Sequence, residues 1–200
     1  MITVYLVRHG QTEENLQRIF QGHLPGVLTE EGRQQAIDLC SQLAELPLDA
    51  VVSSDLQRVV DTVNLAFTGT EQSPDSNVNT AGGCMGTLQS LFDGRQIPWE
   101  RTKLLREIDW GSWTGLAIAS VDTSHIPADA ENKEMLYERA GRFVDYLKTN
   151  YAGKKVLVVA HGLINRSIQA QLEGVGVDHL HEVSHMKNAE IRKFVLAFSA

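Results

Sequence analysis

Cysteine is scarce in this sequence. Only Cys40 and Cys84 occur among 200 residues. Cys40 falls on the apolar face of an expected helix and Cys84 lies in a glycine-rich stretch, so neither a disulfide framework nor a cysteine-based zinc site is indicated. The chain also begins directly in an expected strand at Ile2, without the pattern of a signal peptide. We therefore expect a reducing, cytoplasmic compartment.

Long apolar runs and an excess of positive charge are also missing. No apolar run approaches the roughly 20 residues that cross a bilayer, which argues against a membrane protein. The formal net charge of −7 argues against nucleic-acid binding, which depends on excess lysine and arginine. An anionic small molecule is still a suitable substrate, because a few arginines can dominate one pocket. With 42% hydrophobic and 22% charged residues, the chain is typical of a globular domain of ordinary size.

The first apolar run ends abruptly in polar residues. Ile2–Val7 consists of strand formers and stops at Arg8-His9-Gly10. Strands buried on both faces read as continuous apolar runs, and in open α/β sheets the ligand crevice lies outside the carboxyl ends of the strands. Arg8 and His9 are therefore predicted at the mouth of a site, where Gly10 lets the backbone turn sharply.

A second run with the same ending lies far downstream. Lys155–Ala160 is also apolar and ends in His161-Gly162. A lone His-Gly pair would indicate only a turn, but two strands with this ending predict two imidazoles at one sheet edge. Because one of them follows Arg8, the pattern favours a phosphate-handling site: the planar fork of arginine suits phosphate oxygens.

Apolar residues recur at helical spacing between and after these strands. Four helices are expected. The first begins at a Thr29 cap and ends at Pro47, and the second begins after Ser53-Ser54-Asp55 and extends to Phe67. The other two cover Glu131–Tyr151 and Leu163–Leu172. Further strands are expected at Leu48–Ser53, Glu182–His185 and Ile191–Phe198. This alternation predicts an α/β fold, a three-layer α/β/α sandwich with a mostly parallel central sheet.

Polar and glycine-rich stretches interrupt the pattern. Residues 68–104 and 116–131 are expected to be inserted loops that form a small cap on one domain spanning 1–200. Within the first of them, Thr87–Phe92 is expected as a short helix and Gly94–Lys103 as irregular.

A second arginine and a carboxylate complete the set expected at the sheet edge. Arg58 falls in the first two turns of a helix, and Glu107 lies among tryptophans, glycines and acids. Arginines can neutralise phosphoryl oxygens, a neutral imidazole can attack phosphorus, and a carboxyl group can protonate the leaving oxygen and later activate water. No Mg²⁺ ligand cluster is visible, and the arginines could take over the charge role of a metal. We therefore expect neither a metal nor a cofactor.

Motif blocks extend this picture along the chain. The blocks are Leu6–Thr12 with Asn15, Gln21-Gly22, Leu28–Gly32 with Gln35-Ala36, Ser53–Arg58 with Thr62, Leu105–Ile108 with Gly111, Trp113 and Gly115, and Val159–Gly162 with Arg166. In this order they resemble the histidine phosphatase superfamily, also called phosphoglycerate mutase-like. The resemblance covers nearly the whole chain, and the blocks are highly specific as a set.

The resemblance implies a role for each residue at the sheet edge. His9 would be the phosphorylated nucleophile, and Glu107 would be the proton donor and acceptor. Arg8, Arg58 and His161 would form the phosphate pocket.

The resemblance also implies a second set of contacts. Asn15, Gln21 and Gly22 match positions that line the phosphate or the substrate in relatives. Backbone amides at the helix N-terminus after His161, beginning with Gly162, could add donors for an anion.

Some residues near the site keep two interpretations. Asp109 is as acidic as Glu107, and alternation would place both on the same side of an extended segment, so only the resemblance prefers Glu107. His23 is either a substrate contact or a solvated loop residue. Trp110 and Trp113 either stack on a substrate or pack in the core, and packing is favoured.

Other residues favour a structural interpretation. Arg166 is expected in an ion pair and Glu131 in a cap or a similar structural contact. A metal site is disfavoured for the histidines downstream, which are His179, His181 and His185. Three residues depart from the family pattern in the substrate loop and the Arg58 helix, which bears on specificity rather than on core chemistry; they are Gly26, Val59 and Val63.

Three functions compete. The first is a phosphomonoester phosphatase that acts on a small phosphorylated metabolite through a phosphohistidine and releases inorganic phosphate. The second is a phosphoglycerate mutase, which returns the phosphoryl group to its product; the acid block Arg106–Gly111 resembles the phosphatase branches instead. The third is an inactive phosphate-binding module, which would lack a core residue. Neither the substrate nor the choice between monomer and homodimer follows from the sequence.

Overall fold

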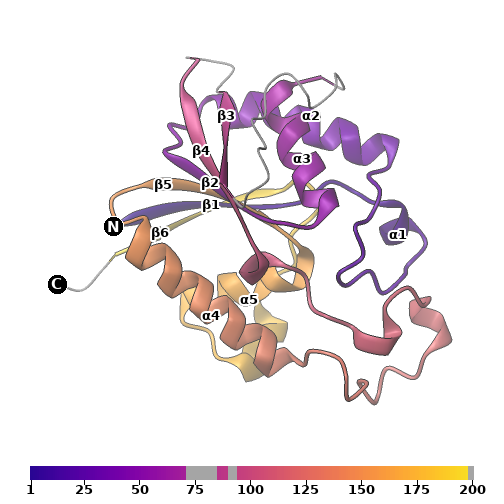
Figure 1. Cartoon of the computed structure of the whole chain (residues 1–200). Coiled ribbons are helices and arrows are strands. Elements are labelled where there is room, and N and C mark those ends of the chain that lie inside the picture. The colour runs from indigo at the N-terminus through magenta and orange to yellow at the C-terminus, as the bar shows by residue number, and fades with distance from the viewer. Residues whose placement is uncertain (71–84, 90–93, 198–200) are drawn as a thin grey trace.

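The computed structural model describes residues 1–70, 85–89 and 94–197. In this part of the chain six strands form one sheet in the order β3-β4-β2-β5-β1-β6 (Figure 1). The inner strands β4, β2, β5 and β1 are parallel, whereas β3 and β6 pair antiparallel at the two edges. The strands are β1 (Ile2–Arg8), β2 (Ala50–Ser54), β3 (Met85–Gln89), β4 (Gln96–Thr102), β5 (Lys155–Ala160) and β6 (Ile191–Leu196).

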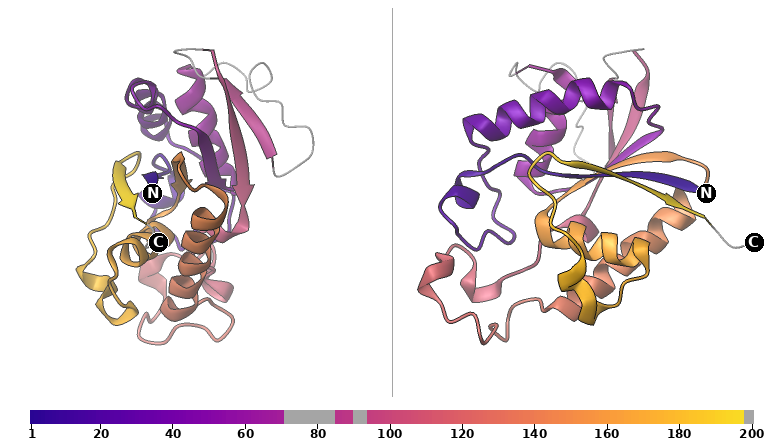
Figure 2. Two further views of the ribbon diagram at one scale, coloured as in Figure 1. Left: turned by 90° about the vertical axis from the view of Figure 1, so that its left-hand side faces the viewer. Right: turned by 180° about the vertical axis from the view of Figure 1, so that it is seen from behind.

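Helices cover both faces of this sheet (Figure 2). α2 (Glu30–Ala44) and α3 (Gln57–Thr68) pack on one face, and α4 (Lys133–Asn150) and α5 (Gly162–Glu173) pack on the other. The short elements are α1 (Glu13–Leu16) and the 3₁₀ turns η2 (Lys103–Leu105), η3 (Gly111–Trp113), η4 (Ile118–Ser120) and η5 (Val177–Glu182). The expected three-layer α/β/α sandwich with a mostly parallel sheet is confirmed.

Burial on both faces explains the continuous apolar run of β1. Val4 and Leu6 belong to the core under α4 and α5, whereas Tyr5 and Val7 belong to the core under α2 and α3. Successive side chains of a strand point to opposite faces, so a central strand of a sandwich needs an apolar residue at every position. Each such side chain contributes about 1.5–3 kcal/mol when fully buried, which anchors the strand end that carries Arg8.

The expectation for the segment before Lys103 was wrong. Gly94–Lys103 is not irregular but contains β4, which lies between β2 and β3. Pro98 has no N–H to donate to a neighbouring strand, so a proline at this position in the sequence disfavours the prediction of a strand. Ile97 and Trp99 are nevertheless buried on either side of it, so packing against the core outweighs local propensity. Thr87–Phe92 is likewise not a helix where it is described, because residues 87–89 belong to β3; residues 90–93 lie outside the described chain.

The expected strand Glu182–His185 is also absent from the structure. Glu182 is the last residue of η5, and arginine side chains take up the carbonyl groups that follow it: Arg166 donates to the carbonyl of Val183, and Arg192 donates to those of Ser184 and His185. The carbonyl groups that a strand would give to a neighbouring strand are therefore satisfied by guanidinium groups. Arg166 also donates to His185, and among the described residues the expected ion pair with a carboxylate is not found.

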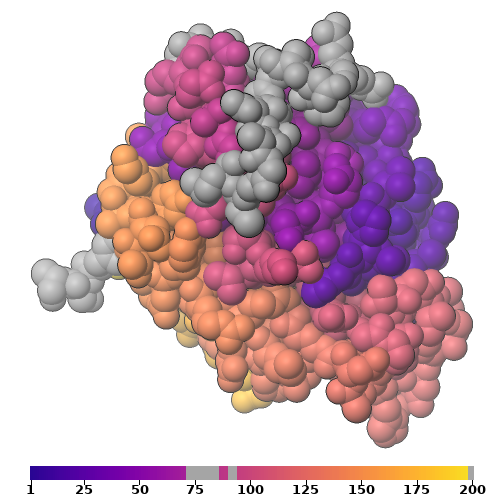
Figure 3. Space-filling model, viewed as in Figure 1, coloured from indigo at the N-terminus to yellow at the C-terminus, as the bar shows by residue number. Residues whose placement is uncertain are grey.

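The segment after α1 and the segment 115–118 lie side by side. Phe20 donates its N–H to the Leu116 carbonyl at 2.9 Å, and Gly115 donates to the Phe20 carbonyl at 2.9 Å. Ile19 and Ala117 form an isolated β-bridge. Figure 3 shows these two parts of the chain, indigo and pink, against each other on one face of the molecule. Within the described ranges, no helix is long and apolar enough to cross a membrane.

Candidate active site

The carboxyl ends of three adjacent strands bring the predicted residues together. Arg8 at the end of β1 pairs with Ala160 at the end of β5, and β2 lies on the other side of β5. His9 and His161 follow these strand ends, and their ring centroids are 5.2 Å apart with an interplanar angle of 64°. The prediction of two imidazoles at one sheet edge is confirmed.

His9 is held as a neutral imidazole. Its side chain is buried, and Nδ1 lies 2.7 Å from the carbonyl oxygen of Gly10. A carbonyl only accepts hydrogen bonds, so Nδ1 carries the proton and Nε2 keeps a lone pair. Burial, together with the positive charges of Arg58 and Arg8, holds the pKa of His9 well below 6.5. At neutral pH the ring is therefore uncharged and has a free nucleophilic nitrogen.

Two glycines set the path of the loop that carries His9. A Cβ atom at Gly10 would lie 2.4 Å from the Gly32 carbonyl oxygen, and one at Gly32 would lie 1.9 Å from the Gln11 carbonyl oxygen. Because no side chain fits between these backbones, the loop packs directly on the first turn of α2. Thr29 caps that helix by accepting from the Gly32 N–H at 2.9 Å, as expected.

Arg58 is fully buried beneath the two histidines. Its Nε donates to Nδ1 of His161 at 3.1 Å, and its terminal nitrogens donate to the carbonyls of Gly22, at 2.9 Å, and Leu24. These bonds use three of its five N–H groups. Burial lowers the pKa of Arg58 to about 10, so the guanidinium is still charged at neutral pH.

His161 is fixed between Arg58 and a serine. Since Nδ1 accepts from Arg58, Nε2 carries the ring proton and donates to Ser54 Oγ at 2.8 Å. Burial, followed by the charge of Arg58, holds the pKa of His161 well below 6.5. The sequence suggested Ser54 only as part of a helix start, yet α3 begins after Leu56, which forms no side-chain cap. Ser54 instead orients a site histidine.

Arg8 presents a buried donor without a partner. Its terminal nitrogen donates to the Met186 carbonyl at 2.8 Å. Its Nε–H has no hydrogen-bond partner within the described ranges. A buried donor left unpaired is costly, and an anion would satisfy it. A Cβ atom at Gly162 would lie 3.6 Å from this guanidinium and 3.6 Å from Glu107 Oε2, so these three residues are neighbours.

Glu107 lies on the N-terminus of α5. Its carboxylate accepts from the N–H groups of Leu163 and Ile164 at 3.1–3.2 Å, where the helix dipole favours negative charge. The amides of Leu163 and Ile164 are therefore bonded to Glu107, and the role expected for the Gly162 amide as an anion donor stays a prediction. Asp109 points elsewhere: its carboxylate accepts from Gly111 and is 48% exposed. The structure thus places Glu107, not Asp109, beside Arg8.

Three further candidates lie around the loop after β1. Asn15 accepts from Asn188 at 3.4 Å, and Asn188 also donates to the His9 carbonyl. Gln21 is buried and donates to Thr12 Oγ1 at 3.0 Å rather than to the site histidines. Gly22 adopts a φ of +48° and gives its carbonyl to Arg58.

The aromatic residues of the acid block pack in the protein. The ring centroids of Trp110 and Trp113 lie 4.7 and 5.1 Å, respectively, from the ring centroid of Phe20. His23 lies 3.0 Å from the Glu107 carbonyl oxygen through Nε2, and Asp109 faces its other nitrogen at 3.6 Å. The favoured packing interpretation therefore agrees with the contacts of both tryptophans.

The downstream histidines have protein partners. His179 lies 2.8 Å from Glu182, and His185 accepts from Arg166 at 2.9 Å. Within residues 1–70, 85–89 and 94–197, no group of three or more histidine, cysteine or acidic residues is arranged to hold a metal ion. Cys40 is a free thiol; Cys84 lies outside the described residues.

Comparison with known proteins agrees with this geometry. A family model described as histidine phosphatase superfamily (branch 1) matches residues 4–77 and 83–198. A 2,3-bisphosphoglycerate-dependent phosphoglycerate mutase from Streptococcus pneumoniae (strain Hungary19A-6) is 30% identical over 208 residues, covering 92% of this chain and 89% of the relative.

Solved structures show the same fold. YhfR from Bacillus stearothermophilus superposes with a TM-score of 0.78 at 26% identity, covering 96% of this chain and 90% of that one. An alpha-ribazole phosphatase from Shigella flexneri superposes with a TM-score of 0.76 at 21% identity, covering 96% and 89%. Because this family model matches nearly the whole chain, the chain belongs to the histidine phosphatase superfamily.

Proposed function

We propose that the protein is a phosphomonoester phosphatase that acts on a small phosphorylated metabolite through a phosphohistidine at His9. The observation that carries this proposal is the state of the His9 ring. Its Nδ1 proton is held by the Gly10 carbonyl, which leaves the Nε2 lone pair available. Arg8 and Arg58 place positive charge around that nitrogen, where a phosphoryl group would need it.

The first step forms the phosphohistidine. Nε2 of His9 attacks phosphorus, the bond between phosphorus and the leaving oxygen breaks, and the carboxyl group of Glu107 gives that oxygen a proton. The guanidinium groups of Arg8 and Arg58 offset the charge on the phosphoryl oxygens without a metal. The unpartnered Nε–H of Arg8 is a donor for one of these oxygens.

The second step restores the enzyme. The Glu107 carboxylate takes a proton from water while the water oxygen attacks phosphorus. The bond between phosphorus and Nε2 breaks, the electron pair returns to His9, and inorganic phosphate leaves. Glu107 is then protonated again for the next turnover.

A phosphoglycerate mutase is the second candidate, favoured by the relative from Streptococcus pneumoniae. In that reaction the phosphoryl group of His9 returns to a hydroxyl of the product instead of to water. The acid block supports the phosphatase: Ile108 follows Glu107 and Trp110 precedes Gly111, where glycolytic mutases tend to carry a basic residue and a tyrosine.

A panel of phosphorylated metabolites tests the proposal, with phosphate release and mutase activity scored side by side in the presence of EDTA. We expect phosphate release, and covalent incorporation of labelled phosphate that His9→Ala abolishes in a folded protein. Dominant transfer between phosphoglycerates would favour the mutase. A folded wild-type protein that binds phosphate esters but neither incorporates nor releases phosphate would favour a binding module. Loss of activity with EDTA, restored by one metal, would contradict the metal-free mechanism.

A further inference from the structure

One arginine outside the predicted set makes contacts with the segment that carries Glu107. Arg139, on α4, has a side chain that is only 12% exposed. It donates to the carbonyl oxygens of Leu104 at 3.0 Å, Arg106 at 2.6 Å and Glu107 at 3.2 Å. The same guanidinium donates to both carboxylate oxygens of Glu131, at 2.9 and 2.6 Å.

These contacts saturate the guanidinium group. Arginine has five N–H donors in a fixed plane, and Arg139 has five acceptors for them: three carbonyl oxygens and two carboxylate oxygens. Glu131 extends the same connection. It accepts from the Asp109 N–H at 3.3 Å through its side chain and donates to the Asp109 carbonyl at 2.7 Å through its backbone.

The segment that Arg139 holds has no regular secondary structure, although the Arg106 side chain pairs with Asp55 and Ile108 is buried in the core. Residues 106–110 belong to no helix or strand. The carbonyl of Arg106 accepts from Arg139, and that of Glu107 accepts from Arg139 and His23. The Glu107 side chain leaves this backbone and reaches the amides of α5. Arg139 therefore holds the backbone carbonyls on both sides of the Arg106–Glu107 peptide bond, while the Glu107 side chain is directed toward α5 and Arg8.

We infer that Arg139, locked by Glu131, is a positioning residue that aims the carboxyl group of Glu107 at the leaving oxygen. This inference rests on the proposed function. A displacement of about 1 Å in a catalytic group can cost about 10²-fold in rate. Lysine cannot replace the planar fork, because its single nitrogen cannot reach five acceptors placed around a plane.

The test compares phosphate esters that differ in their need for a proton. In Arg139→Lys, kcat/KM should fall no more than about threefold for 2,4-dinitrophenyl phosphate, whose leaving group departs unaided. It should fall about 10- to 100-fold for an alkyl phosphate, a part of the roughly 10²–10⁴-fold that general acid catalysis supplies. Glu131→Gln should shift the same ratio in the same direction, and it replaces Arg139→Lys if that variant fails to fold.

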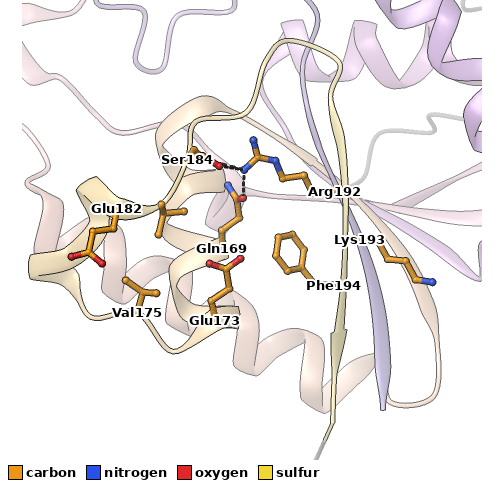
Figure 4. A pocket seen from close by; sticks show the side chains of 9 residues that line it. Gln169, Glu173, Val175, Glu182, Ser184, Arg192, Lys193 and Phe194 are labelled. Carbon is orange, nitrogen blue, oxygen red and sulfur yellow. Dashed lines mark hydrogen bonds between the residues drawn. The ribbon is translucent and has the colours of Figure 1, made fainter.

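A double mutant separates positioning from a merely structural role. If Arg139 acts through Glu107, adding Arg139→Lys to Glu107→Gln should change the alkyl-to-dinitrophenyl ratio no further. Arg192→Lys is the matched control, because Arg192 also holds a carboxylate, that of Glu190, and two carbonyls, those of Ser184 and His185, but on a different segment. Figure 4 shows its side chain bonded to Gln169 and Ser184. It should lower stability without altering the ratio.

Two results would overturn the inference while leaving the proposed function intact. One is an equal loss on all esters in a folded Arg139→Lys protein. The other is full additivity with Glu107→Gln. Wild-type protein that releases no phosphate from any ester would instead refute the proposed function and the inference together.

Discussion

The Nε–H of Arg58 donates to Nδ1 of His161 at 3.1 Å, although the two residues are 103 positions apart. This bond determines which nitrogen of His161 carries its proton, and so it joins α3 to the turn between β5 and α5. It also keeps a positive charge next to both imidazoles, which lowers the pKa of each. The His161 tautomer and the charge around both imidazoles therefore depend on one guanidinium.

Arg58→Lys should separate charge from geometry. The variant keeps a cation but loses the planar fork that bonds His161 and the Gly22 and Leu24 carbonyls. We expect kcat/KM to fall by about 10²–10³-fold, the cost of losing one preorganised donor. Steady-state kinetics measures this, and nitrogen NMR shifts of His161 should report the altered tautomer. A variant within about threefold of wild type would mean that charge alone suffices.

Ser54→Ala should cost both stability and activity. It removes the acceptor of the buried His161 Nε2–H and of the Leu56 N–H, and a buried donor left unpaired costs about 1–3 kcal/mol. Ser53→Ala is the matched control, since buried Ser53 accepts from Trp99 and touches neither histidine. Denaturant unfolding should show losses in both variants, but only Ser54→Ala should lower kcat/KM. Equal activity of the two variants would show that Ser54 has no role in catalysis.

Glu107→Gln should slow alkyl phosphates most, because an alkoxide needs a proton to leave. We expect a loss of about 10²–10⁴-fold on alkyl phosphates and a smaller one on p-nitrophenyl phosphate. The variant should also accumulate phosphohistidine, since the group that activates water is gone. The control is Asp109→Asn, because the Asp109 carboxylate accepts from the Gly111 N–H instead. This variant should slow the formation and the hydrolysis of the phosphohistidine less. The reverse order of damage would assign the acid to Asp109.

Stability should fall as the pH falls below about 6.5. The pKa values of His9 and His161 are held well below 6.5 in the folded protein by burial first and by Arg58 second. Below pH 6.5 the histidines of the unfolded chain bind protons that those of the folded chain do not. The free energy of unfolding therefore decreases as the pH falls. Each ring can remove up to about 1.4 kcal/mol per pH unit. Urea unfolding between pH 7 and pH 5 measures this, and His161→Gln should flatten the curve. An unchanged slope in that variant would show that His161 is not the titrating group.

The strand ends were the part of the site best predicted from sequence. Arg8, His9 and His161 each follow an apolar run, and a buried strand fixes where its last residue lies. The choice between Glu107 and Asp109 could not be made from alternation, because residues 106–110 form no strand and the two side chains leave in different directions.

The supporting residues could not be predicted, because their roles depend on tertiary contacts. Ser54 resembles a helix cap in the sequence, yet its hydroxyl meets a histidine 107 positions away. Arg139 looks like an exposed helix residue until the loop of Leu104–Glu107 is folded against it. β4 contains a proline, and its pairing with β2 and β3 and the burial of Ile97 and Trp99 arise only in the folded protein.

The place of β1 in the sheet also affects how the chain can fold. The strand that ends at Arg8 pairs with β5 on one side and β6 on the other, and both partners come from the last quarter of the chain. Such pairings between distant segments form slowly, because a long loop must close first. On the ribosome, β1 must therefore wait, unpaired, until β5 has emerged, and its second edge stays open until β6 follows. A fragment that ends before Lys155 would contain His9 but could not bring His161 next to it.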